Sequence, residues 1–140
     1  MIEVDNSTDL SVPLKKITAI KEHLTDKSIE LLILDSDSMR EMNRGHRGVD
    51  KPTDVLSFPL SDEVDSLPLG TIIICDKFVK KGSNKFKHKK SEEFQLLFIH
   101  GLLHLLGFDH ETDNGKMRKK EKKLIKKFNL PKSLIVRVEG

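Results

Sequence analysis

The chain of 140 residues carries 25 basic and 22 acidic residues, for a formal net charge of +3, and it has no tryptophan or tyrosine. A chain of this length is expected to form one domain over residues 1–140 and to bury about 68–70% of its unfolded surface. No apolar run approaches the roughly 18 residues of a membrane span, and the first residues lack a signal-peptide pattern. The sequence therefore argues against an integral membrane protein and predicts a cytoplasmic protein without a membrane partner.

The first half of the chain alternates strand and helix patterns. Ser11 is a candidate N-cap for the first helix, and the run Asp35-Ser36-Asp37 can cap a short second one that runs through Asn43. Two prolines confine a later strand and favour an edge or terminal position for it. The predicted elements are a strand over 2–5, a helix to about residue 25, a strand over 28–35, the short helix, a polar loop that contains Arg47, and a strand over 53–58.

The second half contains an acidic loop over 60–68, a buried strand over 69–76, and a lysine-rich segment that Asp76 would cap. Ser91 is the candidate N-cap of a strongly apolar helix, and a last helix is expected to begin at 111–113 and to end near residue 130. The pattern predicts an α+β fold. Its mixed sheet of about four strands would be covered by helices, with the apolar helix central.

The single cysteine, Cys75, rules out an internal disulfide. It lies in the apolar run 71–75, where a buried structural thiol is expected rather than a reactive one. A reducing compartment suits such a residue.

Two histidines on the apolar helix indicate a metal site. His100 and His104 are four residues apart, so they lie on one helix face with their Cβ atoms roughly 5–6 Å apart. Buried imidazoles need polar partners, since an unsatisfied buried group costs about 1–3 kcal/mol. Gly107 can end the helix in a left-handed conformation and bring His110 back to the same point. Three histidines with an open fourth position are typical of catalytic zinc, although nickel or another divalent ion could bind the same ligands.

The positive charge is concentrated near this helix. Residues 1–70 carry 8 basic and 14 acidic residues, whereas residues 71–140 carry 17 and 8. Two lysine-rich clusters, over 77–90 and 116–127, flank the histidine helix in sequence. Either cluster alone would be read as a solvated surface, but together they favour a polyanionic partner, with nucleic acid the leading candidate. Binding should follow the phosphate backbone and weaken steeply with salt.

The histidine spacing is similar to the H-E-x-x-H-x-x-G-x-x-H motif of the metzincin proteases. Gly101 stands where those proteases carry their catalytic glutamate, so the general base of that family is missing. A peptidase of that type is therefore not expected.

Two motifs together resemble the YbeY family of bacterial rRNA-maturation endoribonucleases. They are Thr-Asp-Val-Leu-Ser-Phe-Pro over 53–59 and His-Gly-Leu-Leu-His-Leu-Leu-Gly-Phe-Asp-His over 100–110. Their order and separation fit the family as well, with Leu69-Gly70 and an Ile-rich strand between them. Family members commonly carry an aromatic residue before a functional arginine and an acidic residue after the Leu-Gly pair, where this chain has His46 and Thr71.

The resemblance implies a single-strand-specific endoribonuclease with zinc on His100, His104 and His110 and a functional arginine at Arg47. It also implies a role in 16S rRNA 3′-end processing and ribosome quality control, with RNA as the partner, namely rRNA of the small ribosomal subunit, and no DNA partner expected.

The expected chemistry is metal-assisted phosphodiester hydrolysis, with Arg47 stabilising negative charge on the phosphate. The general base stays open among Asp109, Glu111 and His46, and attack by an RNA 2′-hydroxyl is a further option. Two other functions compete with this one. A non-catalytic, metal-stabilised rRNA-binding assembly factor would use the same lysines, and a small-molecule hydrolase would leave the lysines unexplained.

Overall fold

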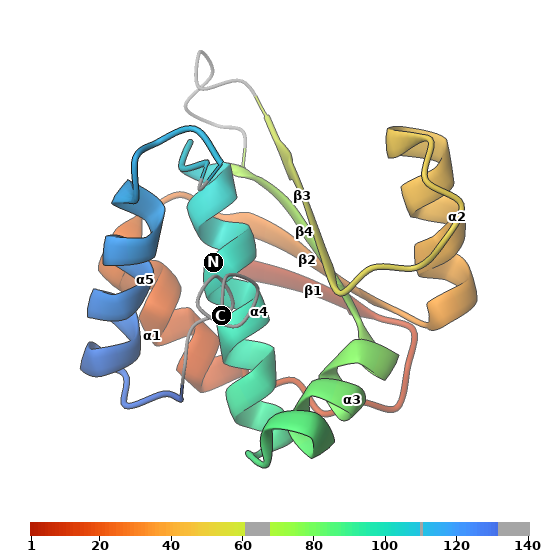
Figure 1. Ribbon diagram of the computed structural model, residues 1–140, viewed down its shortest axis with the longest axis horizontal. Helices are drawn as coiled ribbons and strands as arrows, with labels where there is room; N and C mark the ends of the chain where they lie inside the picture. The colour runs from red at the N-terminus through yellow and green to blue at the C-terminus, as the bar shows by residue number, and fades with distance from the viewer. Residues whose placement is uncertain (61–67, 110, 132–140) are drawn as a thin grey trace.

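A computed structural model describes the chain over residues 1–60, 68–109 and 111–131. This part forms four strands and five helices, drawn in Figure 1. In chain order they are β1 (Ile2–Asn6), α1 (Leu14–Leu24), β2 (Ile29–Leu34), α2 (Ser36–Arg47), β3 (Val55–Pro59), β4 (Gly70–Cys75), α3 (Asp76–Phe86), α4 (Lys90–Leu105) and α5 (Lys116–Lys127). Most of the acidic loop and His110 lie outside the described residues.

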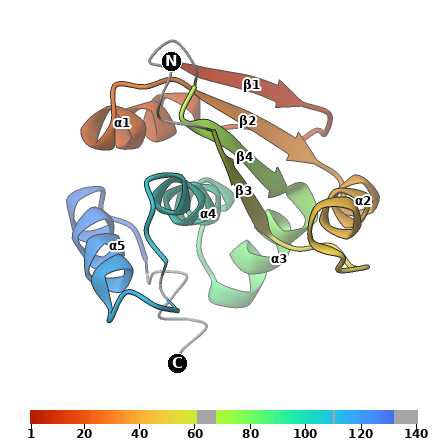
Figure 2. The same ribbon diagram turned by 90° about the horizontal axis from the view of Figure 1, so that it is seen from above.

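The four strands form one mixed sheet in the order β1-β2-β4-β3. β1, β2 and β4 are parallel, and β3 is antiparallel to β4 at the edge, as its flanking prolines predicted. Helices α1, α4 and α5 lie on one side of the sheet, whereas α2 lies at its far end (Figure 2). The predicted α+β fold, with a mixed sheet of about four strands, is confirmed.

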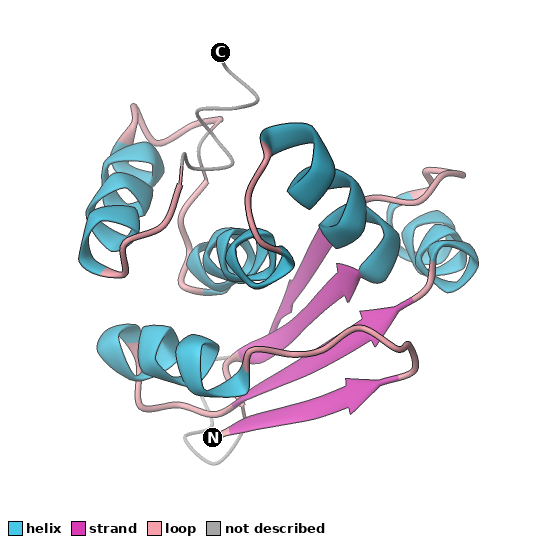
Figure 3. Cartoon of the chain, turned by 90° about the horizontal axis from the view of Figure 1, so that it is seen from below, coloured by secondary structure: helices cyan, strands magenta, loops and turns pink. Residues whose placement is uncertain are grey.

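α4 is the central helix. It is surrounded by the sheet, α1, α3 and α5, and the large core cluster includes its residues Phe94, Leu97, Phe98 and Leu102 (Figure 3). Most of the helix is buried, as its apolar sequence predicted. A smaller cluster on the opposite face of the sheet joins Met39 of α2 to β3 and β4.

A glycine allows α4 to lie directly against the sheet. A Cβ atom built at Gly101 would lie 2.9 Å from Ile72 Cγ2, 3.1 Å from Ser57 Oγ and 3.2 Å from Val55 Cγ2. The Ser57 hydroxyl also donates a hydrogen bond of 2.8 Å to the Gly101 carbonyl. Position 101 therefore faces β3 and β4, and a side chain as large as glutamate has no space there.

The helix ends differ from several predictions. Asp35 does cap α2, since its carboxylate accepts the Ser38 N–H at 2.8 Å, and this bond lowers the pKa of Asp35. Ser11 and Ser91 are not caps: α1 begins after Pro13 without a side-chain cap, and Ser91 lies inside α4. Asp76 is the first residue of α3 rather than its cap. α5 begins at Lys116, several residues later than expected.

Cys75 is fully buried at the end of β4, which confirms the predicted structural thiol. Burial raises the pKa of this thiol because the thiolate would lose its hydration. In the part of the chain that the structure describes, no helix is both long and apolar enough to cross a membrane.

Candidate active site

The histidine helix borders a pocket of about 530 Å³. The C-terminal half of α4, the end of α2, β3 with the residues before it, and the loop after α4 all contribute to its lining. The contributing residues are Arg47, Thr53, Asp54, Val55, Leu56, Ser57, Pro59, His100, His104, Asp109 and Glu111. Residues of both sequence motifs, 53–59 and 100–110, therefore line the same pocket.

The two imidazoles of α4 face each other. The Nε2 atoms of His100 and His104 are 3.2 Å apart, and their ring planes meet at 77°. The helical spacing of four residues places the rings one above the other, as the sequence predicted. Gly107 then ends the turn with φ of +97°, and its N–H bonds to the His104 carbonyl.

The other nitrogen of each ring is held by an acceptor. The Nδ1 atom of His104 lies 3.0 Å from the Phe108 carbonyl, and that of His100 lies 3.0 Å from Glu121 Oε2. A carbonyl and a carboxylate can only accept, so each Nδ1 carries the proton and each neutral ring keeps its lone pair on Nε2. Histidine ligands of metals are oriented in this way by carboxylates or backbone carbonyls. The two Nε2 atoms are 3.2 Å apart, within hydrogen-bond distance of each other, and two imidazoles oriented in this way also fit a single divalent metal ion.

Glu121 is a site residue that the sequence analysis missed. It is the single acidic residue of the lysine-rich helix α5, and it is 1% exposed because it turns inward to His100. Met117, Glu121 and Leu124 share the buried face of the helix. An acid at helical spacing between apolar residues, in a helix otherwise rich in lysine, was the available signal.

His110, the third predicted ligand, lies outside the described residues. Within residues 1–60, 68–109 and 111–131, no group of three or more His, Cys, Asp or Glu side chains is arranged to hold a metal ion. The structure thus brings two of the three predicted ligands together, and the role of His110 stays a prediction.

Arg47 reaches the pocket from the last turn of α2, not from a loop as predicted. Gly48 ends the helix with φ of +70°, and the following segment is tied back to α2. Arg40 forms two hydrogen bonds of 2.8 and 3.1 Å with Asp50, which lower the pKa of that carboxyl. The buried Asn43 amide donates to the Lys51 carbonyl at 2.8 Å. These bonds fix the chain direction directly after Arg47.

Three carboxylates line the pocket: Asp109 and Glu111, as anticipated, and Asp54, which was not singled out. Asp54 accepts the Val55 N–H at 2.7 Å, so one of its oxygens is already engaged. His46 is not among the lining residues, and its ring packs on Phe58 with 4.9 Å between centroids. The arrangement favours the three carboxylates over His46 as general base.

The sequence as a whole places the chain among known proteins. A family model described as endoribonuclease YbeY matches residues 3–129. The chain belongs to this YbeY family. A protein from Sulfurimonas denitrificans named endoribonuclease YbeY is 55% identical over 140 residues and covers 100% of both chains. One of the same name from Aliarcobacter butzleri is 54% identical and covers 98% of this chain and 99% of its own.

A solved structure has a similar fold. The solution structure of TM1509 from Thermotoga maritima is 29% identical to this chain. It superposes with a TM-score of 0.62, and the match covers 91% of this chain and 89% of that one. The resemblance first drawn from two motifs is therefore confirmed over nearly the full length.

Proposed function

We propose that the chain is a single-strand-specific, metal-dependent endoribonuclease that acts in rRNA maturation, at the 3′ end of 16S rRNA, and in ribosome quality control. The observation that carries this proposal is the pair of Nε2 atoms of His100 and His104, 3.2 Å apart on a pocket that Arg47 also lines. Relatives named endoribonuclease YbeY support the activity. The substrate would be rRNA of the small ribosomal subunit, in the cytoplasm.

Zinc is the proposed metal, with His100, His104 and His110 as its ligands and nickel or another divalent ion as the alternative. When bound, such an ion supplies a Lewis acid and lowers the pKa of a coordinated water towards neutrality. Glu121 and the Phe108 carbonyl hold the two described imidazoles in the tautomer that such binding requires.

The residues of the pocket have separate roles in this proposal. The guanidinium of Arg47 contacts two oxygens of the scissile phosphate and stabilises the charge that develops there. Asp54, Asp109 and Glu111 are the carboxylates placed to accept a proton from the attacking group, which is water or the neighbouring 2′-hydroxyl. The absence of a glutamate at position 101 does not argue against catalysis, because that position faces the sheet.

Cleavage of an end-labelled single-stranded RNA by the purified chain tests the proposal. We expect cleavage that is lost with a chelator, restored by added zinc and absent in the variant His104→Ala. The variant excludes a contaminating nuclease, which would copurify with both proteins. RNA that binds without being cut, both alone and with small ribosomal subunits present, would contradict the enzyme and favour a non-catalytic assembly factor.

Replacing Arg47 by lysine is expected to lower the cleavage rate about tenfold, because lysine keeps the charge but loses the planar, two-pronged contact. The measurement is the single-turnover rate on the same RNA.

Arg44→Lys is the matched control for this variant. Arg44 lies one turn earlier on α2, exposed and 3.9 Å from Glu41, and does not line the pocket. Its variant should retain the full rate. Equal rates for Arg47→Lys and the unmodified chain would show that Arg47 does not hold the phosphate.

A further inference from the structure

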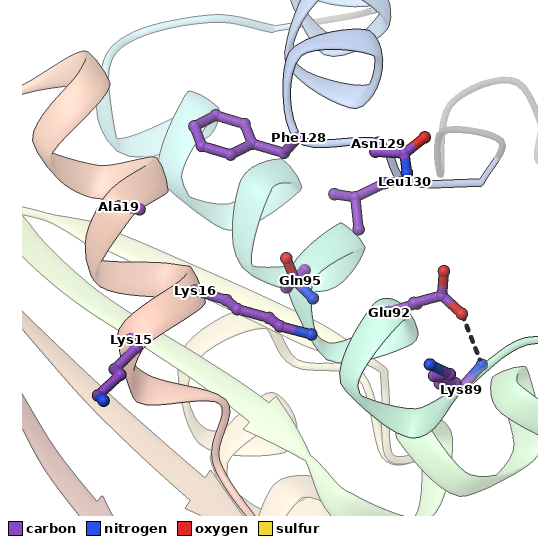
Figure 4. Close-up of a pocket in the computed structure, with 9 residues that line it drawn as sticks. All are labelled: Lys15, Lys16, Ala19, Lys89, Glu92, Gln95, Phe128, Asn129 and Leu130. Carbon is purple, nitrogen blue, oxygen red and sulfur yellow. Dashed lines mark hydrogen bonds between the residues drawn. The ribbon is translucent and has the colours of Figure 1, made fainter.

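A second pocket lies away from the histidines, where three helices meet. It has a volume of about 470 Å³ and is bounded by the first two turns of α1, the start of α4 and the residues directly after α5 (Figure 4). Its cationic residues are Lys15, Lys16 and Lys89, and the segment 128–130 closes one side. We call this pocket the lysine cleft.

The lysines of the cleft are exposed, and they come from elements far apart in sequence. Figure 4 shows Lys16 extending across the cleft towards Gln95. Among the described residues, Lys15, Lys16 and Lys89 have no carboxylate within ion-pair distance. The single acid of the cleft, Glu92, accepts the backbone N–H of Lys89 at 2.9 Å. The cleft therefore carries three cations and one carboxylate, a net charge of +2.

Helix α5 connects the lysine cleft to the active site. It follows Asp109 and Glu111, which line the active pocket, and leads into Phe128, which lines the cleft. Its 12 residues span roughly 18 Å at 1.5 Å per residue. Its one acid, Glu121, is turned inward to His100. The exposed side carries only cations: Lys116, Arg118, Lys119, Lys122, Lys123, Lys126 and Lys127.

We propose that the lysine cleft is a second RNA-binding site, which holds the phosphate backbone of a single-stranded substrate at a distance from the scissile bond. The strand would leave the active pocket, follow the cationic side of α5 and reach the cleft. This inference rests on the proposed function, since it assigns RNA as the ligand. A small anion would need only the cleft, whereas a cleft linked towards the active pocket by the exposed cations of α5 matches an extended polyanion.

The test compares the binding of single-stranded RNAs of about 4 and about 16 nucleotides. These lengths are the lower and upper limits of the site sizes that are common in single-strand-binding domains. The cleft variant carries three substitutions together: Lys15→Gln, Lys16→Gln and Lys89→Gln. A chelator is present in all binding measurements so that no RNA is cut. For the unmodified chain, we expect much tighter binding of the long RNA. The variant should bind the long RNA roughly tenfold more weakly, with a slope of log K against log salt reduced by about 2, and should bind the short RNA equally well.

The matched control removes the same charge from α3, through Lys77→Gln, Lys81→Gln and Lys85→Gln. Substitution of the three cleft lysines by arginine should preserve the binding. The inference is overturned if the long RNA binds the cleft variant within twofold of the unmodified chain, or if the α3 control loses as much affinity. Cleavage of the long RNA by the unmodified chain in the presence of zinc reports on the active site. Its failure, both alone and with small ribosomal subunits present, would refute the proposed enzyme without altering the binding result for the cleft.

Discussion

Replacing Glu121 by alanine is expected to weaken divalent-metal binding about 10- to 100-fold, the usual cost of removing a residue that orients a metal ligand. The Glu121 carboxylate lies 3.0 Å from His100 Nδ1 and is almost fully buried, so no water replaces it easily. Without this acceptor, the His100 ring loses the contact that keeps its lone pair on Nε2. The measurement is a titration of zinc against a competing chelator, which does not depend on RNA cleavage.

Two comparisons make this result specific. Glu121→Gln keeps an acceptor oxygen but loses the charge, so its zinc affinity should fall between those of the unmodified chain and Glu121→Ala. Melting temperatures of the metal-free proteins report any loss of stability separately. An unchanged zinc affinity in a folded Glu121→Ala protein would mean that the contact with His100 is only structural.

Replacing Gly101 by alanine is expected to lower the free energy of unfolding by about 1–3 kcal/mol, the usual cost of adding a methyl group to a packed core. The added Cβ would meet Ile72 at 2.9 Å and Val55 at 3.2 Å, both on buried or half-buried strands. Separating α4 from the sheet would also stretch the hydrogen bond from Ser57 to the Gly101 carbonyl. Chemical denaturation with urea measures the change.

Gly45→Ala is the matched control. Gly45 lies inside α2 with open space where its Cβ would be, so alanine should stabilise the helix by about 0.5–1 kcal/mol. Equal stability of Gly101→Ala and the unmodified chain would show that α4 can move off the sheet without cost. The larger variant Gly101→Glu should not fold at all, which would explain why this chain cannot use the glutamate of the metzincin motif.

The sequence by itself determined most of the architecture and part of the site. Apolar runs of strand length predicted the sheet, and the apolar composition around His100 predicted a central buried helix. A spacing of four residues was enough to pair His100 with His104, because helix geometry alone places such residues together. The two motifs also identified the family, which the comparison over residues 3–129 confirmed.

The tertiary structure decided what local patterns do not encode. Glu121 reaches His100 only because α5 packs against α4, and its lysine-rich surroundings in the sequence concealed a buried position. The sequence showed that Gly101 replaces a glutamate, but only packing against β3 and β4 explains the replacement. The lysine cleft likewise combines α1, α4 and α5, whose cations are distant in sequence. Such contacts depend on how elements pack, and packing is decided by the whole core rather than by any one segment.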